Sequence, residues 1–248
     1  MSKLRTSIPL LNYAVYNGNL SEAVLSDKTL INTINQYSFC MALQDAEFKQ
    51  ALEQSDILLP DGMAIVAAMR LLKAGKINKI AGADIHLHLL KDLNEKGGSC
   101  FYLGSSENTL LKIKERLSIE FPNVRVQTYS PPFKTKFSAQ ENQEMIASIN
   151  TFVPDVVFVG MTAPKQEKWA FQHKALLHTQ TICTIGAVFD FYAGTVSRPS
   201  SFWINLRLEW FIRLVKEPKR MWKRYLYYGP VFIAYVFRTK MGLVLKNE

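Results

Sequence analysis

Predicted strands and helices alternate along the middle of this 248-residue chain, and this alternation restricts its fold more than any other feature. Short apolar runs such as residues 155–159 and 181–185 are separated by amphipathic segments of helical period. Strands that are joined by helices form a mainly parallel sheet, with the helices crossing over its faces. The sequence therefore predicts an α/β fold with a Rossmann-like sheet and crossover helices.

The predicted elements follow one another from residue 29 onward, without an internal repeat or a low-complexity linker. The strands are expected at residues 29–34, 56–59, 100–103, 124–129, 155–159 and 181–185. The helical segments are expected at residues 39–52, 65–72, 82–97, 107–120, 139–152 and 165–177. The composition changes near residue 195, which divides the chain into a core (1–195) and a C-terminal appendage (196–248).

The appendage is basic and aromatic. It contains eleven Lys and Arg against three Glu, a surplus of eight in a chain of net charge +9, and three of the four tryptophans. On a helical wheel Arg213, Arg220 and Arg224 fall on one face, opposite Trp210 and Trp222. Arginines beside aromatic rings suit a surface where an apolar layer meets phosphate. The alternative is an ordinary helical hairpin with a basic surface.

The chain is expected to lie on a membrane rather than to cross one. Its longest apolar run, residues 225–237, is interrupted by Gly229 and Pro230. At 1.5 Å per residue the run spans about 20 Å, short of the ~30 Å hydrocarbon core. The first residues show no apolar run typical of a signal peptide. Three cysteines, scattered in apolar runs, predict reduced core thiols in a cytoplasmic protein.

Three predicted strands end in loops that contain Gly104, Gly160 and Gly186. In an open α/β sheet, ligands bind beyond the carboxyl ends of the strands, where helix N-termini offer N–H groups to anions. These loops predict a nucleotide site. The chain lacks GxGxxG, which disfavours a nicotinamide cofactor, and lacks GxxxxGK[ST], which disfavours a P-loop NTPase.

Polar residues at the ends of the first two predicted strands are candidates for chemistry. Asp61 stands between Pro60 and Gly62, where a carboxylate suits general-base work. It also suits the N-cap of the next helix. Thr33 and Asn35 present alternate side chains on one face after the first strand. They are expected either to bind a sugar or to cap the following helix.

Two further segments carry candidate ligand contacts. Lys165 and Gln166 begin a helix and are expected to face a phosphate or a sugar. The next residue, Glu167, is explained by the helix dipole alone. Asp190 follows the last strand between aromatic residues, and it suits a ligand contact and a helix cap equally.

No metal site is predicted. The chain has no DxD pair that would bridge a metal to a diphosphate. His86 and His88 are two residues apart, so on a helix they face different ways. His173 and His178 have no acidic or cysteine partner close in sequence. All four histidines are expected to be ordinary core or surface residues.

Several motifs occur together in an order and spacing that resemble one enzyme family, the WecG/TagA/CpsF family, glycosyltransferase family 26. The motifs that carry this resemblance are Thr33-Ile34-Asn35, Leu59-Pro60-Asp61-Gly62-Met63, Ile80-Ala81-Gly82-Ala83-Asp84, Val159-Gly160-Met161-Thr162-Ala163-Pro164-Lys165-Gln166-Glu167, Gly186-Ala187-Val188-Phe189-Asp190-Phe191-Tyr192-Ala193-Gly194, Arg207-Leu208-Glu209-Trp210 and Glu217-Pro218-Lys219-Arg220. The match covers almost the whole chain.

The resemblance implies an inverting glycosyltransferase that needs neither a metal nor a cofactor. Family members move a sugar from a UDP-sugar onto a polyprenyl-diphosphate-linked saccharide at the cytoplasmic face of the membrane. By resemblance, Asp61 is the base that deprotonates the acceptor hydroxyl, and Thr33 and Asn35 hold the donor sugar. Gln166 contacts the sugar or the diphosphate, and Asp190 lies near the uracil.

The same resemblance assigns the basic residues. Arg207, Arg213, Arg220 and Arg224 match arginines that grip the lipid diphosphate and close over the active site. Lys79 stands where the family usually has arginine. A lysine supplies positive charge to a departing UDP, but it cannot form the pair of parallel hydrogen bonds that an arginine forms with a phosphate.

Other functions fit parts of the pattern. A non-catalytic membrane-docked module that binds nucleotide sugars would keep the glycine loops but would not depend on Asp61. A nucleic-acid binder is disfavoured because the charge lies beside aromatic residues on one amphipathic element. The sequence does not distinguish N-acetylmannosamine-type from glucose-type donors, and it leaves open whether a second copy of the chain is a partner.

Overall fold

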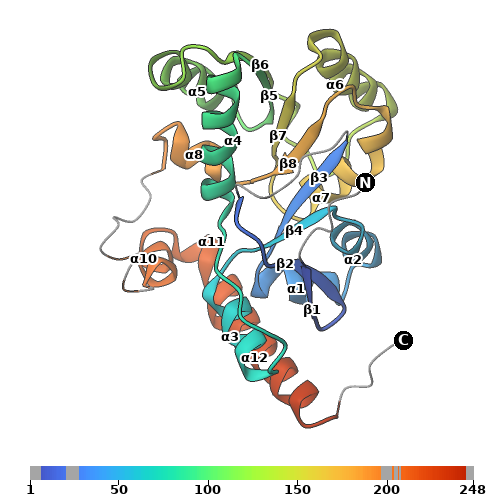
Figure 1. The fold of residues 1–248 in the computed structure, drawn as a ribbon, viewed down its shortest axis with the longest axis vertical. Coiled ribbons are helices and arrows are strands. Elements are labelled where there is room, and N and C mark those ends of the chain that lie inside the picture. The colour runs from blue at the N-terminus through green and yellow to red at the C-terminus, as the bar shows by residue number, and fades with distance from the viewer. Residues whose placement is uncertain (1–6, 21–27, 197–202, 204–205, 207, 244–248) are drawn as a thin grey trace.

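A six-stranded parallel sheet forms the centre of the molecule (Figure 1). The computed structural model describes residues 7–20, 28–196, 203, 206 and 208–243. The strand order is β4-β3-β8-β7-β5-β6, and all neighbouring strands are parallel. The strands are β3 (Thr29–Ile34), β4 (Ile57–Pro60), β5 (Ser99–Gly104), β6 (Arg125–Tyr129), β7 (Val156–Gly160) and β8 (Thr181–Thr184). The predicted α/β class is confirmed.

Helices cover both faces of this sheet (Figure 1). One face packs against α4 (Gly82–Lys96), α5 (Glu107–Glu120) and α8 (Val188–Tyr192). The other packs against α6 (Ala139–Phe152) and α7 (Lys165–His173), which a 3₁₀ turn, η2 (Lys174–Leu176), extends. The remaining helices of the first 195 residues are α1 (Gln36–Ala42), α2 (Ala46–Glu53) and α3 (Met63–Leu71).

Capping side chains start four of the described helices, three of which bear on the sequence prediction. Asn35 starts α1, and Ser138 starts α6 in a reciprocal capping box with Glu141. Asp45 accepts a hydrogen bond from the Phe48 N–H and starts α2. The single helical segment expected over residues 39–52 is therefore wrong. It is two helices, because the cap at Asp45 satisfies the amide groups of a new helix start.

Buried polar residues fix the inner strands. His86 is 2% exposed and shares a 2.7 Å hydrogen bond with the hydroxyl of Tyr102, and burial lowers its pKa to about 3. The histidine is a neutral core residue, as expected. Thr184 donates to Asn32 over 2.6 Å, which ties β8 to β3. Cys40, Cys100 and Cys183 are buried free thiols.

A short antiparallel hairpin precedes the sheet, and the sequence analysis did not predict it. It consists of β1 (Ser7–Leu10) and β2 (Tyr13–Tyr16). The apolar side of the hairpin joins a third cluster of buried residues together with α1, α3 and the last helix of the chain. Strands of four residues are too short for their alternation of buried and exposed side chains to give a clear sequence signal.

The appendage folds into helices. They are α10 (Glu209–Lys216), α11 (Pro218–Trp222), the π-helical turn η3 (Lys223–Tyr227) and α12 (Tyr228–Lys240). Pro218 restarts the helix at its first position, where a missing N–H costs nothing. Gly229 and Pro230 lie in the first turn of α12 and do not interrupt it, which corrects the expectation of a broken apolar run. In the described part of the chain, no helix is long and apolar enough to span a membrane.

The last helix docks on the core beside α3 (Figure 1). Tyr228, Phe232 and Val236 are buried at a spacing of four residues, which places them on one side of α12. The Phe232 ring contacts that of Phe39 edge-to-face, with centroids 5.2 Å apart. The division at residue 195 remains a prediction, and α12 links the two proposed parts through shared apolar packing.

Replacement of Phe232 by alanine is expected to destabilise the protein by about 3 kcal/mol or more, because it removes a buried aromatic ring from the shared cluster. Phe237→Ala is the matched control, since Phe237 lies on the same helix but is 49% exposed. Urea denaturation of both variants checks the difference. Equal stability of the two variants would mean that α12 does not pack as described.

Candidate active site

A cavity of about 1220 Å³ opens at the carboxyl edge of the sheet. Residues at or just after the ends of all six strands line it: Thr33 and Asn35, Asp61, Ser105, Ser130, Gly160, and Ile185 with Gly186. Free N–H groups at helix starts and the strand-end loops meet here, as expected for ligand binding in a parallel sheet.

Most of the predicted site residues border this one cavity, although they come from distant parts of the chain. They are Thr33, Asn35, Asp61, Gly160, Lys165, Gln166, Gly186, Asp190, Arg213 and Arg224. Gly104 and Lys79 are not among the lining residues. Arg207 lies outside the described residues, and of Arg220 only the backbone, in α11, is described.

Asp61 is held at the end of the strand pair β3–β4. Its backbone N–H donates to the carbonyl of Ile34 over 2.9 Å. The N-cap of α3 is Gly62, whose φ of 123° favours glycine, so Asp61 does not occupy the cap position. The alternative that Asp61 is the N-cap of α3 is therefore not supported. Asp61 is instead one of the residues that line the cavity.

Asn35 is a helix cap and a cavity residue together. Its Oδ1 accepts hydrogen bonds from the N–H groups of Tyr37 and Ser38, both over 3.0 Å. The capping alternative is confirmed for this residue. Because Oδ1 is engaged, a ligand would be met by the side-chain N–H groups of Asn35.

The glycines of the strand-end loops allow close packing. A Cβ on Gly104, where φ is 119°, would lie 2.5 Å from the carbonyl oxygen of Gly160. A Cβ on Gly160 would lie 2.6 Å from the ring of Phe189. These two positions need glycine because β5, β7 and α8 approach each other closely beneath the cavity.

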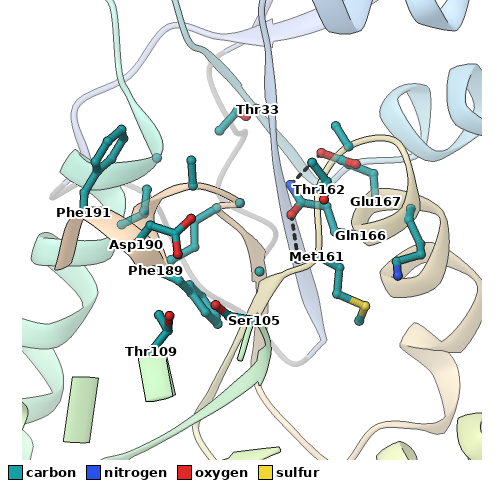
Figure 2. Close-up of a pocket in the computed structure, with 18 of the residues that line it drawn as sticks. Thr33, Ser105, Thr109, Met161, Thr162, Gln166, Glu167, Phe189, Asp190 and Phe191 are labelled. Carbon is teal, nitrogen blue, oxygen red and sulfur yellow. Dashed lines mark hydrogen bonds between the residues drawn. The ribbon is translucent and has the colours of Figure 1, made fainter. Parts of the chain in front are cut away.

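The Gln166 side chain is built into the wall (Figure 2). Its Oε1 accepts from the Met161 N–H over 3.2 Å, and its Nε2 donates to Oε1 of Glu167 over 2.9 Å. Gln166 is 4% exposed. Its amide therefore holds the β7–α7 loop and orients Glu167.

Glu167 is a site residue that the sequence analysis missed. It lines the cavity, is 2% exposed, and its Oε2 is buried with no hydrogen-bond partner. Burial raises the pKa of its carboxyl to about 7, while the Gln166 hydrogen bond and the Arg224 charge act in the opposite direction. The sequence does indicate that this side of α7 is buried, because Trp169 and Ala170 lie on the same side of the helix one turn later.

The loop after β6 forms part of the rim and was also not predicted. The Lys165 ammonium donates to the carbonyl of Lys134 over 2.8 Å and lies 4.4 Å from the centre of the Phe137 ring. Burial lowers the pKa of Lys165. Ser130 donates to the carbonyl of Ser105 over 2.8 Å. Lys165 thus fastens this loop to α7.

Two arginines of the appendage close one side of the cavity. The Arg213 guanidinium lies 5.2 Å from the centre of the Phe191 ring, and its Nε is buried without a hydrogen-bond partner. The Arg224 guanidinium lies 4.6 Å from the centre of the Tyr37 ring. Both arginines keep positive charge next to an aromatic face, which orients them without neutralising them.

Asp190 lies in the first turn of α8, on the side of the cavity opposite Gln166 and Glu167 (Figure 2). The N-cap of this helix is Ala187, so the cap position is not that of Asp190. Within the described residues, no three His, Cys, Asp or Glu side chains gather as a metal site would require.

Comparisons with known proteins identify a family and two relatives. A model of the glycosyl transferase WecG/TagA/CpsF family matches residues 1–245. The N-acetylglucosaminyldiphosphoundecaprenol N-acetyl-beta-D-mannosaminyltransferase of Bacillus subtilis strain 168 is 32% identical over 197 residues, 79% of this chain and 75% of that protein. The enzyme of the same name from Bacillus spizizenii is 30% identical over 185 residues, 75% of this chain and 70% of its own.

Gly160→Ala is expected to destabilise the protein by about 1–3 kcal/mol, because the added methyl group meets the Phe189 ring. Gly229→Ala serves as the control. A Cβ at Gly229 meets nothing beyond its chain neighbours and its own helix, but Pro230 disfavours a helical alanine before it, so a smaller loss of stability than at Gly160 is expected. Thermal melts of both variants check this, and an unchanged melt for Gly160→Ala would contradict the close approach.

Proposed function

This chain belongs to the WecG/TagA/CpsF family of glycosyl transferases, and we propose that it moves a sugar from a UDP-sugar onto a polyprenyl-diphosphate-linked saccharide during assembly of a cell-surface polysaccharide. One observation carries the proposal. Asp61, from the core, borders the same cavity as Arg213 and Arg224, from the appendage. The residue proposed as the proton acceptor and the two arginines proposed to bind the diphosphate thus border one cavity.

The names of the relatives suggest the substrates. Those enzymes are named as transferring an N-acetyl-β-D-mannosaminyl group to N-acetylglucosaminyldiphosphoundecaprenol. We propose an N-acetylmannosamine-type donor with this acceptor as the first substrate pair to test, and a glucose-type donor with the same acceptor as the second. The acceptor would enter with its lipid toward the appendage and its sugar toward Asp61.

In the proposed reaction, Asp61 takes the proton from the attacking hydroxyl of the acceptor. The hydroxyl oxygen bonds to the anomeric carbon of the donor, on the face opposite the nucleotide. The bond from that carbon to the β-phosphate oxygen breaks, and UDP leaves with the electron pair. A single displacement of this kind inverts the anomeric configuration. Thr33 and the amide of Asn35 would hold the donor sugar.

The charge that develops on UDP needs positive partners. Lys165 borders the cavity, and N–H groups at helix starts add partial charge. We propose that these groups replace a metal ion and that no cofactor is needed. Arg207 and Arg220 are proposed to share in binding the lipid diphosphate. Lys79 would join the leaving group only after a rearrangement, because it does not line the cavity.

Nucleotide contacts are proposed for the opposite wall. Asp190 would lie near the uracil, and Gly160, Lys165, Gln166 and Gly186 would border the diphosphate or the sugar. Gly104 would contribute indirectly, since it allows β5 to pack against β7 at the floor.

Exposed apolar and basic side chains on the appendage support a proposed contact with a lipid surface. Exposed apolar side chains lie along its helices at Trp210, Phe211, Val215, Trp222, Leu226, Tyr227, Ile233, Phe237 and Met241. Lys216, Lys219 and Lys223 lie on the same helices. We propose that this surface rests on the inner face of the cytoplasmic membrane, where each basic residue near anionic lipid contributes ~1 kcal/mol. A second copy of the chain remains open as a partner.

The function is tested by incubating the purified full chain with UDP-N-acetylmannosamine or UDP-glucose and a short-chain N-acetylglucosaminyl-diphospho-polyprenol. Release of UDP that depends on the acceptor, and that persists in EDTA, is the expected result. Activity that is lost in EDTA and restored by Mg²⁺ or Mn²⁺ would contradict metal independence. No transfer with any UDP-sugar would favour the non-catalytic module.

Asp61→Asn is expected to lower the turnover number at least ~10²-fold, since loss of a general base costs 10²- to 10⁴-fold. The affinity for UDP, measured by calorimetry, should change little because the amide keeps the shape of the side chain. Glu115→Gln, an exposed carboxylate on α5, is the control. If the Asp61 variant retains more than half of the activity, Asp61 is not the base.

A further inference from the structure

We propose that Arg116 and Glu120, on α5, are positioning residues for the donor nucleotide. They hold Tyr192 at the C-terminal end of α8, the helix that presents Asp190 to the cavity. This inference rests on the proposed function, in which Asp190 lies near the uracil. It gives a role to side chains to which the proposed reaction assigns none.

The helix α8 is too short to hold its own position. It has five residues, Val188–Tyr192, whereas an isolated helix in water is marginal below about 12–15 residues. Its first turn is fixed by packing, since Phe189 is buried and its ring lies against Gly160 of β7. Asp190 and Phe191 come next and border the cavity (Figure 2). Their placement therefore depends on how the other end of the helix is held.

Arg116 holds that other end by two contacts. Its Nη1 donates to the backbone carbonyl of Tyr192 over 2.9 Å, and its guanidinium lies 4.5 Å from the centre of the Tyr192 ring. The carbonyl belongs to the last residue of α8, where the negative end of a helix favours a cation. The contact with the ring adds a cation–π attraction. One side chain of α5 thus contacts both the backbone and the side chain at the end of α8.

Glu120 ties the other two residues together. Its Oε1 accepts from Nε of Arg116 over 2.7 Å, and its Oε2 accepts from the Tyr192 hydroxyl over 3.0 Å. Burial raises the pKa of Tyr192, so its hydroxyl keeps the proton and donates. The three side chains form a closed set in which each contacts the other two. We call this set the α8 clamp.

The α8 clamp is a contact between helices. Arg116 and Glu120 are four residues apart and partly exposed, so their ion pair by itself stabilises α5 little. Lys96 and Asp92 form an ion pair of the same spacing on α4. Arg116 and Glu120 differ because both also bond to Tyr192, on another helix. Since groups that contact a ligand keep their geometry through the residues that hold them, the α8 part of the cavity wall rests on this clamp.

The clamp should act on binding rather than on the chemical step. Asp61, the proposed base, is held by a different part of the fold, because its N–H donates to the Ile34 carbonyl at the end of the β3–β4 pair. A shift of α8 would move Asp190 away from the nucleotide and leave Asp61 in place. Loss of the clamp should therefore weaken nucleotide binding and change the turnover number little, whereas a general loss of structure would lower both.

The test compares Arg116→Ala with Arg116→Lys in the full chain, and Lys96→Ala is the matched control. UDP binding is measured by calorimetry, and transfer is measured with the substrates named above. Arg116→Ala should raise the Kd for UDP and the KM for the UDP-sugar about tenfold, with the turnover number within twofold of the wild type. Arg116→Lys keeps a cation but not the planar group that reaches Glu120 and the Tyr192 carbonyl together, so it should lose only about threefold. Lys96→Ala should match the wild type.

A double-mutant cycle tests whether the clamp acts as one unit. Glu120→Gln keeps the size of the side chain and leaves the contacts between Arg116 and Tyr192, so it should raise the Kd for UDP about threefold. The double variant with Arg116→Ala should bind UDP no more weakly than Arg116→Ala alone, because the clamp is already broken. Thermal melts establish that each variant is folded. If Arg116→Ala is not, the losses in Arg116→Lys and Glu120→Gln against Lys96→Ala carry the test.

Unchanged UDP affinity in a folded Arg116→Ala would overturn the proposal, and so would additive effects of Arg116→Ala and Glu120→Gln. A fall in turnover number without a rise in the donor KM would also overturn it, since the clamp would then support the fold or the chemical step. Wild-type protein that binds UDP but transfers no sugar would refute the proposed function alone, and the UDP affinities would still test the clamp. Wild-type protein that does not bind UDP would refute both.

Discussion

All six strands of the central sheet run in one direction, so their carboxyl ends meet at one edge, and this constraint places the whole candidate site. Thr33 and Gly186 are more than 150 residues apart in the chain but border one cavity because β3 and β8 are neighbours. Glycine at positions 104 and 160 lets the strand ends and α8 pack closely beneath it. The fold therefore brings the polar groups of the site together, and hydrogen bonds such as that from Gln166 to Glu167 orient some of them.

Charged groups that line a cavity lose part of their hydration, which costs free energy. The protein offsets this cost with weak interactions to uncharged groups. The Lys165 ammonium donates to a backbone carbonyl and lies beside the Phe137 ring. The guanidinium groups of Arg213 and Arg224 lie beside the rings of Phe191 and Tyr37. None of these partners cancels the charge. Burial raises the pKa of the Glu167 carboxyl to about 7. The positive groups that border the cavity thus lie beside aromatic rings.

The sequence was sufficient for the sheet and for most of the cavity wall, because strand ends and helix starts carry local signals. Asp61, Gly160 and Asp190 were found in this way. Glu167 was missed because its place in the first turn of α7 already had a local explanation, and only tertiary packing shows that it is buried. The β1–β2 hairpin was missed because its strands are stabilised by α12, which lies more than 200 residues later in the chain.

The same helix explains how an exposed apolar surface can be connected to the candidate site. One side of α12 is buried against the hairpin, α1 and α3, and other positions on the helix, such as Ile233 and Phe237, are exposed. This packing anchors the C-terminal end of the appendage, while Arg213 and Arg224, further back along the chain, reach the cavity. Because α12 follows η3 directly, Arg224 and the exposed apolar positions of α12 lie on consecutive helical segments. In the proposed function, this continuity would make acceptor binding depend on how the appendage rests on the membrane surface.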